Sequence, residues 1–318
     1  MPYSPLVHGK WRGRDSKTAE TASTRYALLH EKACAHRSEG QSPRCRLEGR
    51  TPHIWLITVS NYAVQILSRL GLNEPSARAI APKLVIASYE AGQPIWLQDQ
   101  RIAAWCFLIT GLVVGTSPRM SGKRLPMTLH GPQTWFGEVP ILNDEPTVLD
   151  YVCATDAQLI RMPVQTFRDA ISRDPGFSAH LLRSTARHAQ LQMDLIISLK
   201  VDSPTMRCVL GLAQIAAALY PSAEGRESLA VPIKQSLVAA ICGVSRTLLS
   251  HYLQALQMAG WVRVHYSRLE LVRPDAWVRL ARTMHRHRLF ERQVTIDDMV
   301  RELEQAAQEQ AAPDTNKP

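Results

Sequence analysis

The segment of residues 232–262 constrains the fold of this chain more than any other. It reads PIKQSLVAAICGVSRTLLSHYLQALQMAGWV, and apolar residues recur at helical spacing on both sides of Cys242-Gly243. They are Leu237, Val238 and Ile241 before the glycine, and Leu248, Leu249, Tyr252, Leu253 and Leu256 after it. Two short helices joined by a tight glycine-containing turn form a helix-turn-helix, whose second helix enters the major groove of DNA. The segment therefore predicts a sequence-specific DNA-binding unit.

Length and composition leave room for two folded domains. The chain has 318 residues, of which 45% are hydrophobic and 20% charged, so each domain can bury a core of its own. The net charge of +9 is compatible with a polyanionic partner such as double-stranded DNA. The sequence contains no apolar run of about 18 residues, and no signal-type apolar stretch follows the N-terminus. We therefore expect a cytoplasmic protein without a membrane partner.

Residues 1–52 form a polar, basic N-terminal segment that we expect to be poorly ordered. Residues 1–50 hold ten Lys and Arg against five Asp and Glu, with little apolar periodicity. An inert tail is the favoured interpretation, and a basic arm that touches DNA is the alternative. Cys34 and Cys45 lie in this segment, where a thiol could be reactive, and their role stays open.

The other four cysteines stand in apolar surroundings. The six cysteines contain no C-x-x-C pair, which argues against a zinc site, a disulfide scaffold or an iron–sulfur cluster. Free cysteines in apolar contexts usually behave as small buried hydrophobic residues. We expect this for Cys106, Cys153, Cys208 and Cys242.

Residues 53–174 change from helical to strand character and back. The apolar spacing predicts a helix over 58–71 and a short one from Pro75 to Ala81. From Lys83 to Met162, short apolar runs alternate with Gly, Pro, Asn and Asp, which predicts an antiparallel β-sandwich or β-roll. A short helix over Gln165–Arg173 closes this domain. The fold class is therefore α+β.

Residues 175–200 are predicted to form one long helix with an apolar stripe. Its members recur every three or four residues, so the stripe must be buried against a partner. The alternatives are the chain's own β-domain or the same helix of a second copy. Because the helix links two domains, a coiled-coil homodimer is favoured. The residues proposed for dimerisation are Leu181, His188, Leu191 and Leu195.

Residues 201–280 surround the helix-turn-helix and complete a DNA-binding domain. A helix over Met206–Tyr220 precedes it, with a loop over Pro221–Ser228. The alternating pattern of WVRVHYSRLELV after it predicts a β-hairpin wing, with Arg263 and Arg268 as candidate phosphate contacts. Residues 281–318 are predicted to be a C-terminal helix and a polar tail.

The order of these elements resembles the Crp/Fnr family of bacterial transcription regulators over about residues 60–280. The run from Gly243 to Leu253 is similar to the family's recognition-helix motif, although Leu248 stands where the family has Thr. Gly137-Glu138 and Ile109-Thr110-Gly111 are similar to motifs of the family's sensor domain. The resemblance implies a cyclic-nucleotide-binding-like β-roll (a double-stranded β-helix), a dimerisation helix and a winged helix-turn-helix.

The start of the predicted recognition helix carries the candidate base contacts. Arg246 can grip guanine through two hydrogen bonds, as its counterpart does in the family. Thr247 replaces the family's frequent Glu, and His251 replaces a later Arg, so the half-site should differ from that of well-known members. Ser245 is the expected N-cap. Ser250 on the same helix, and Lys234 and Gln235 before it, complete the set, the last two as phosphate contacts.

The predicted sensor motif departs from the cyclic-nucleotide pattern. Family members that bind cAMP or cGMP use the Gly-Glu pair for the nucleotide and an Arg-Ser pair about ten residues later for the phosphate. Val148-Leu149 occupies the Arg-Ser positions here, which argues against cyclic nucleotides. Gly137 and Glu138 stay candidate effector-binding residues, but a structural role, with Glu138 held by the backbone or a nearby base, is favoured.

The identity of any effector or cofactor stays unknown from sequence. Haem bound through His130 or Cys153, a thiol-redox signal or the absence of any ligand are open alternatives. RNA polymerase is a further candidate partner, because family activators can contact it near the loop Pro221–Ser228.

Two other classes compete with DNA binding. A cupin-like metal-dependent enzyme on the same roll would need several His or Glu ligands, whereas His130 is the only histidine of the β region. No nucleophile elbow or P-loop is present, so we predict no catalytic residues and no metal site. The second alternative is a scaffold whose winged helix binds protein rather than DNA.

Overall fold

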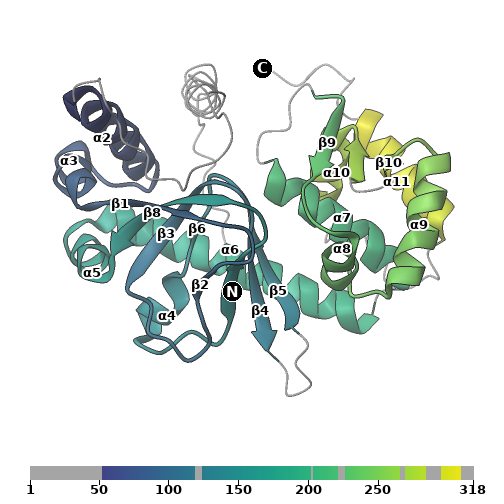
Figure 1. Ribbon diagram of the computed structural model, residues 1–318, viewed down its shortest axis with the longest axis horizontal. Helices are drawn as coiled ribbons and strands as arrows, with labels where there is room; N and C mark the ends of the chain where they lie inside the picture. The colour runs from purple at the N-terminus through teal and green to yellow at the C-terminus, as the bar shows by residue number, and fades with distance from the viewer. Residues whose placement is uncertain are drawn as a thin grey trace, which may run out of the picture. The chain divides into compact units, whose positions relative to one another are not determined.

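The computed structural model describes residues 52–118, 124–201, 203–220, 226–265, 269–283 and 295–308 (Figure 1). The predicted N-terminal segment with Cys34 and Cys45, the wing residue Arg268 and the C-terminal tail after residue 308 lie outside these ranges.

The predicted β-roll is present as two antiparallel four-stranded sheets (Figure 1). One has the strand order β1-β8-β3-β6 and the other β2-β7-β4-β5. Their bounds are β1 Val85–Tyr89, β2 Pro94–Trp96, β3 Ala104–Thr110, β4 Val113–Pro118, β5 Arg124–His130, β6 Trp135–Phe136, β7 Asp150–Cys153 and β8 Ala157–Pro163. Gly92 and Gly111 both have positive φ, as the turn chemistry of the sequence predicts.

Strand β3 forms the centre of the roll because both of its faces are covered. Its first five residues, from Ala104 to Leu108, are all buried. Trp105 packs against Phe167 and Phe177, whose rings come from the helical side. Alternate side chains of a strand point to opposite faces, so Cys106, which pairs with Phe136, faces the other way. Because both faces of β3 are buried, apolar residues are needed on both of them, and the strand shows no alternation with polar residues.

Short helices flank the roll, mostly where the sequence predicts them. They are α2 Pro52–Arg69, α3 Glu74–Ile80, the 3-10 turn η1 Ala81–Lys83, and α5 Val164–Arg173. Helix α4, Glu138–Asn143, is not predicted, because its six residues are too few to show a helical period.

The long helix α6, Pro175–Val201, starts at a polar junction with the roll's first helices. The buried carboxylate of Asp174 accepts hydrogen bonds from the amides of Gly176 and Phe177 at the start of α6. Its second oxygen accepts from the backbone and side-chain N–H groups of Asn73, the N-cap of α3. One carboxylate therefore satisfies free amide groups of two helix starts.

The DNA-binding unit predicted from the sequence consists of five helices and a three-stranded sheet among the described residues. The helices are α7 Pro204–Leu219, α8 Gln235–Ile241, α9 Arg246–Met258, α10 Pro274–Thr283 and α11 Ile296–Gln308. The hairpin β10 Val262–Val264 and β11 Leu269–Val272 confirms the wing, and β9 Ser228–Val231 pairs with β11 as a strand that the sequence does not predict.

Helix α11 belongs to the core of this winged-helix unit. Met299 and Leu303 are fully buried in the same hydrophobic cluster as Leu253 of α9 and Trp277 of α10. The domain therefore extends beyond the predicted boundary at residue 280. The amphipathic pattern of α11 shows that one face is buried but does not show against what.

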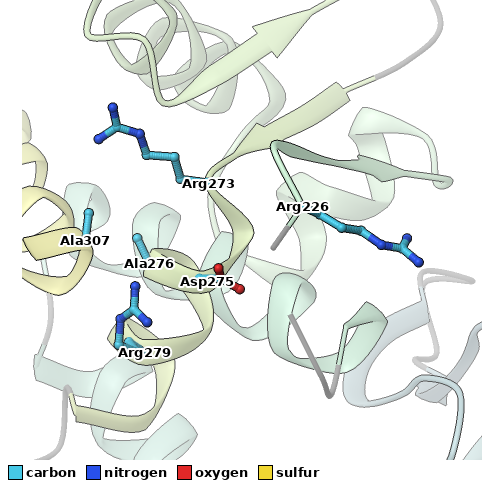
Figure 2. A pocket seen from close by; sticks show the side chains of 6 residues that line it. All are labelled: Arg226, Arg273, Asp275, Ala276, Arg279 and Ala307. Carbon is cyan, nitrogen blue, oxygen red and sulfur yellow. The ribbon is translucent and has the colours of Figure 1, made fainter. Parts of the chain in front are cut away.

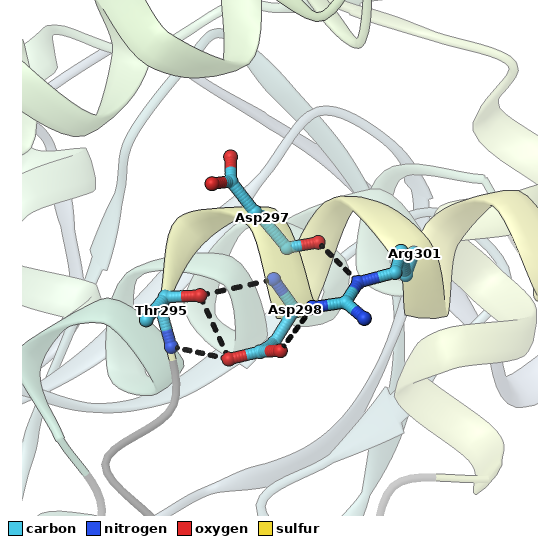
Figure 3. A network of polar contacts seen from close by, with 4 residues as sticks. All are labelled: Thr295, Asp297, Asp298 and Arg301. Carbon is cyan, nitrogen blue, oxygen red and sulfur yellow. Dashed lines mark hydrogen bonds and ion pairs between the residues drawn. The ribbon is translucent and has the colours of Figure 1, made fainter.

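The start of α11 is held by a reciprocal cap (Figure 3). The Thr295 hydroxyl accepts from the amide of Asp298, and the carboxylate of Asp298 accepts from the amide and hydroxyl of Thr295. Arg301 pairs with the same carboxylate at 2.6 Å. This capping box fixes where the helix begins.

The four predicted buried cysteines are confirmed as buried free thiols. Within the described residues no single helix combines the length and apolar character that a bilayer crossing requires. Helices α8 and α9 meet those criteria only when taken together, across a bend of 96°.

The place of α11 in the core leads to a first prediction. Leu303→Ala should lower the free energy of unfolding of the winged-helix unit by about 2–5 kcal/mol, because it leaves a cavity beneath α9. The neighbouring exposed change Glu304→Ala should alter it by less than about 0.5 kcal/mol. Urea denaturation followed by tryptophan fluorescence measures both, and equal effects would place α11 outside the core.

Candidate nucleic-acid interface and sensor site

The turn between α8 and α9 has the geometry of a helix-turn-helix. Helix α8 ends at Ile241, Gly243 takes the left-handed conformation with φ of 64°, and α9 begins at Arg246. The hydroxyl of Ser245 accepts a hydrogen bond from the amide of Leu248 at 3.2 Å. The N-cap predicted at Ser245 is therefore confirmed, and it fixes the first turn of α9.

One face of α9 is solvent-exposed and polar. Leu249, Leu253 and Leu256 bury the opposite face. The exposed face carries Arg246, Thr247, Ser250, His251 and Gln254, at spacings that keep them on one side of the helix. The first four are the predicted base contacts, and the structure brings them together.

Gln254 is a candidate contact that the sequence pattern does not single out. Its spacing of four residues from Ser250 places it on the same face of the helix and could have identified it. That spacing is not specific, because Gln also occurs on ordinary solvent-exposed helix faces. Its amide can form the paired hydrogen bonds that select adenine.

The residues predicted to contact phosphates flank this face. Lys234 is exposed and is the N-cap residue of α8, and Gln235 is half-buried in its first turn. On the wing, the exposed Arg263 lies 3.6 Å from the buried carboxylate of Glu270. The side chain of Gln257 on α9 accepts from the amide of Val264, so the hairpin is attached directly to α9.

The Gly-Glu motif of the sensor domain begins α4. Gly137 has φ of 92°, and a side chain there would meet the ring of Trp96 at 3.0 Å, so glycine is required. Glu138 is only 4% exposed. One carboxylate oxygen accepts from Nε1 of Trp105 at 3.3 Å, and the other lies 2.7 Å from Nδ1 of His188 on α6.

His188 is thus the nearby base expected beside Glu138. Burial raises the pKa of Glu138, but hydrogen bonding to His188 and its charge outweigh burial, so the pKa lies below its ordinary value. The carboxylate is therefore held in its ionised form.

The segment that would face a nucleotide phosphate carries no basic side chain. Val148 is 75% exposed, and the buried residue is Thr147, whose hydroxyl bonds to the backbone of Leu149. Asp150 is buried beside it, accepts from the amide of Gln98 and pairs with Arg124 at 3.5 Å. A phosphate here would meet a carboxylate.

Aromatic rings fill the interior of the roll near this motif. Trp96, Phe136 and Tyr151 pack within 5.3–5.7 Å of one another, measured between ring centroids. The ring of His130 stacks on Phe136 at 4.9 Å, and its Nε2 lies 3.1 Å from the Thr128 hydroxyl. His130 therefore serves as a packed aromatic residue with one ring nitrogen engaged.

Helix α6 presents two different faces. Phe177 and Leu181 are buried in the core of the roll, and His188 bonds to Glu138. Leu181 and His188 thus face their own roll, which differs from their predicted place at a dimer contact. The side chains of Leu191 and Leu195 lie outside the described part of the chain.

An exposed small or apolar stripe runs along another face of α6. Its residues recur at alternating steps of three and four, and all are exposed. They are Ala179, Leu182, Ala186, Ala189, Met193 and Ile196.

A pocket of about 280 Å³ lies in the winged-helix unit, lined by Arg226, Arg273, Asp275, Ala276, Arg279 and Ala307 (Figure 2). The guanidinium groups of Arg226 and Arg273 point away from each other. Each is occupied elsewhere, over the rings of Tyr220 and Trp261 respectively. These two arginines therefore do not converge on one ligand.

Comparisons with known proteins agree with this architecture. Residues 86–174 match the cyclic nucleotide-binding domain. A CRP-like cAMP-activated global transcriptional regulator of Mycobacterium tuberculosis is 24% identical over 204 residues, which cover 63% of this chain and 91% of that protein. The cyclic AMP receptor protein of Thermus thermophilus is 26% identical over 179 residues, or 55% and 78% of the two chains.

A solved structure has the same fold. FixK2 from Bradyrhizobium japonicum superposes with a TM-score of 0.54 at 17% identity, over 67% of this chain and 99% of that one. Residues 86–174 therefore form a cyclic nucleotide-binding domain, and the chain is similar in sequence and fold to regulators of the Crp/Fnr type. Within this roll, Glu138 contacts α6 directly through His188.

The half-buried His130 leads to a second prediction. Burial lowers its pKa to about 4, the charge of Glu138 opposes that shift, and the charge of His188 adds to it. Because an unfolded histidine takes up a proton near pH 6.5 and the folded one does not, stability should fall as the pH drops from about 6.5 toward 4.

His130→Phe keeps a ring and removes this titration. Between about pH 7 and pH 5, the wild type should lose about 1–2 kcal/mol more unfolding free energy than the variant. Urea denaturation at the two pH values measures the difference, and identical losses would show that His130 does not titrate in this way.

Proposed function

We propose that this Crp/Fnr-type chain is a dimeric, sequence-specific DNA-binding transcription regulator whose roll does not respond to cAMP. The observation that carries the proposal is the exposed polar face of α9, set by the Ser245 cap and connected to a wing by Gln257. The relative from Mycobacterium tuberculosis is a transcriptional regulator, which supports the same role for this chain.

The chemistry of this face favours reading of base edges. Arg246, at the first turn of α9, can donate two hydrogen bonds to guanine, and Gln254 can pair with adenine. Thr247 and His251 replace residues that typical members carry, which supports an operator different from theirs. Lys234 and Gln235 are suited to phosphate contacts, which orient the unit on the duplex.

The exposed stripe of α6 supports a homodimer. Steps of three and four residues are the a/d pattern of a coiled coil, and Leu182 is 73% exposed in the single chain. Two copies joined along this stripe would present two recognition helices to half-sites about one turn of DNA apart. The dimer contact that we propose thus lies at Leu182, Met193 and Ile196, beside the predicted residues.

Three features argue against cAMP as the effector. Both carboxylate oxygens of Glu138 are engaged by donors of the chain itself. The Arg-Ser positions carry Val148 and Leu149, and Asp150 is buried next to them. An anionic phosphate needs charge-assisted donors, and this site would offer it a negative neighbour instead.

An enzyme on the same roll finds less support. Among the described residues, no three His, Cys, Asp or Glu side chains gather as a metal-binding group. Stoichiometric metal in the purified protein would favour that alternative, and it is measured by elemental analysis.

A third prediction concerns Arg246. With a duplex selected from random DNA by the wild-type protein, Arg246→Ala should lower affinity about 10- to 100-fold at fixed salt, by loss of a paired guanine contact. Arg173→Ala removes the same charge from an exposed position on α5 and should leave affinity unchanged. Fluorescence anisotropy measures both. If Arg246→Ala binds like wild type, α9 does not read this DNA.

A fourth prediction concerns the dimer. Leu182→Glu combined with Met193→Glu should raise the dimer dissociation constant at least about a hundredfold, because four charges would enter an apolar seam. Gln192→Glu adds charge to an exposed position beside the stripe and should leave the dimer intact. Sedimentation velocity distinguishes the two, and an undisturbed dimer in the double variant would contradict the α6 interface.

A further inference from the structure

We propose that His188 is an internal substitute for an effector: its Nδ1–H occupies the sensor carboxylate of Glu138 and holds α6 on the roll without any small molecule. The proposal deepens the proposed function and rests on it for the consequence at DNA. The contact itself can be tested independently of DNA.

The carboxylate of Glu138 has a donor on each oxygen. Nε1 of Trp105 donates to one from strand β3, and Nδ1 of His188 contacts the other at 2.7 Å from α6. A carboxylate that is 4% exposed needs such partners, because an unpaired buried charge is strongly unfavourable. A sugar hydroxyl would have to compete with His188 for the same buried oxygen, so the imidazole is a competitor that the chain itself supplies.

The position of His188 on α6 lets this contact hold a part of the helix that apolar packing does not reach. In an ideal helix, Phe177, Leu181 and His188 fall within roughly 40° of one another around the axis. Phe177 and Leu181 attach the first turns of the helix to the core by apolar burial. His188 lies about two turns further along the same face and adds a directional polar contact where the side chains of α6 become more exposed.

The same contact fixes where the exposed stripe points. The stripe from Ala179 to Ile196 is centred roughly 130° around α6 from the roll-facing residues. Rotation of the helix about its axis would break the contact between His188 and Glu138 and would turn the stripe away from a partner. The hydrogen bond therefore selects the rotational position of α6 that brings two chains, and their α9 helices, together.

The experiment uses the full-length protein and four single variants. His188→Ala removes the donor, and His188→Asn restores an N–H group near the position of Nδ1. Glu138→Gln removes the charge of the acceptor. His180→Ala is the matched control, a histidine on the same helix with no hydrogen bond to Glu138 in the described structure.

Three measurements are made without added effector and then with cAMP. Hydrogen exchange reports the amides of residues 181–190, anisotropy reports affinity for the selected duplex, and calorimetry reports cAMP binding. We expect His188→Ala and Glu138→Gln to speed exchange in this stretch about tenfold or more and to weaken DNA binding about tenfold. His188→Asn should stay within about threefold of wild type, and His180→Ala should match it.

The outcomes separate the proposals. Unchanged exchange in His188→Ala would overturn the internal-substitute role, as would failure of His188→Asn to rescue, because ring packing alone would then explain the effect. Wild-type protein in which cAMP slows exchange in α6 would overturn it too. If exchange follows the expected order but wild type binds no duplex, the contact stands and the DNA-binding function fails.

Discussion

Helix α6 has to satisfy two surfaces at once, so its rotation about its own axis governs both the sensor contact and the exposed stripe. Phe177 and Leu181 bury one face in the roll, so the stripe that contains Leu182 must face outward. Apolar burial alone would allow α6 to slide or rotate slightly against the roll. The hydrogen bond between His188 and Glu138 does not, because its geometry is directional and its acceptor is buried.

In the cyclic nucleotide-binding domain, the buried carboxylate of Glu138 is satisfied by donors of the chain itself. The roll keeps the glutamate at the start of α4, but the donors that satisfy it come from Trp105 and His188. Aromatic rings of Trp96, Phe136 and Tyr151 occupy the interior next to it. A shared fold does not by itself establish a shared ligand, since ligand chemistry depends on a few side chains.

Much of the fold follows from local pattern. The period of apolar residues predicts α8, α9 and the wing, because short helices and hairpins are encoded by neighbours in sequence. Helix α4 and strand β9 are not predictable in this way, because elements of six or four residues show too little period. For α11 the pattern shows a buried face, but only the packing of Met299 and Leu303 reveals that it supports α9.

The same distinction holds for the candidate sites. The exposed polar face of α9, which we propose reads bases, can be predicted from the amino-acid sequence, because the cap at Ser245 and the buried leucines set it within one helix. The lack of a phosphate-binding charge at Val148 and Leu149 can be predicted in the same way. The pairing of His188 with Glu138, and the outward position of Leu182 rather than Leu181, emerge only from the folded chain. One helix carries two apolar faces, and which of them meets the roll depends on contacts fifty residues away in the chain.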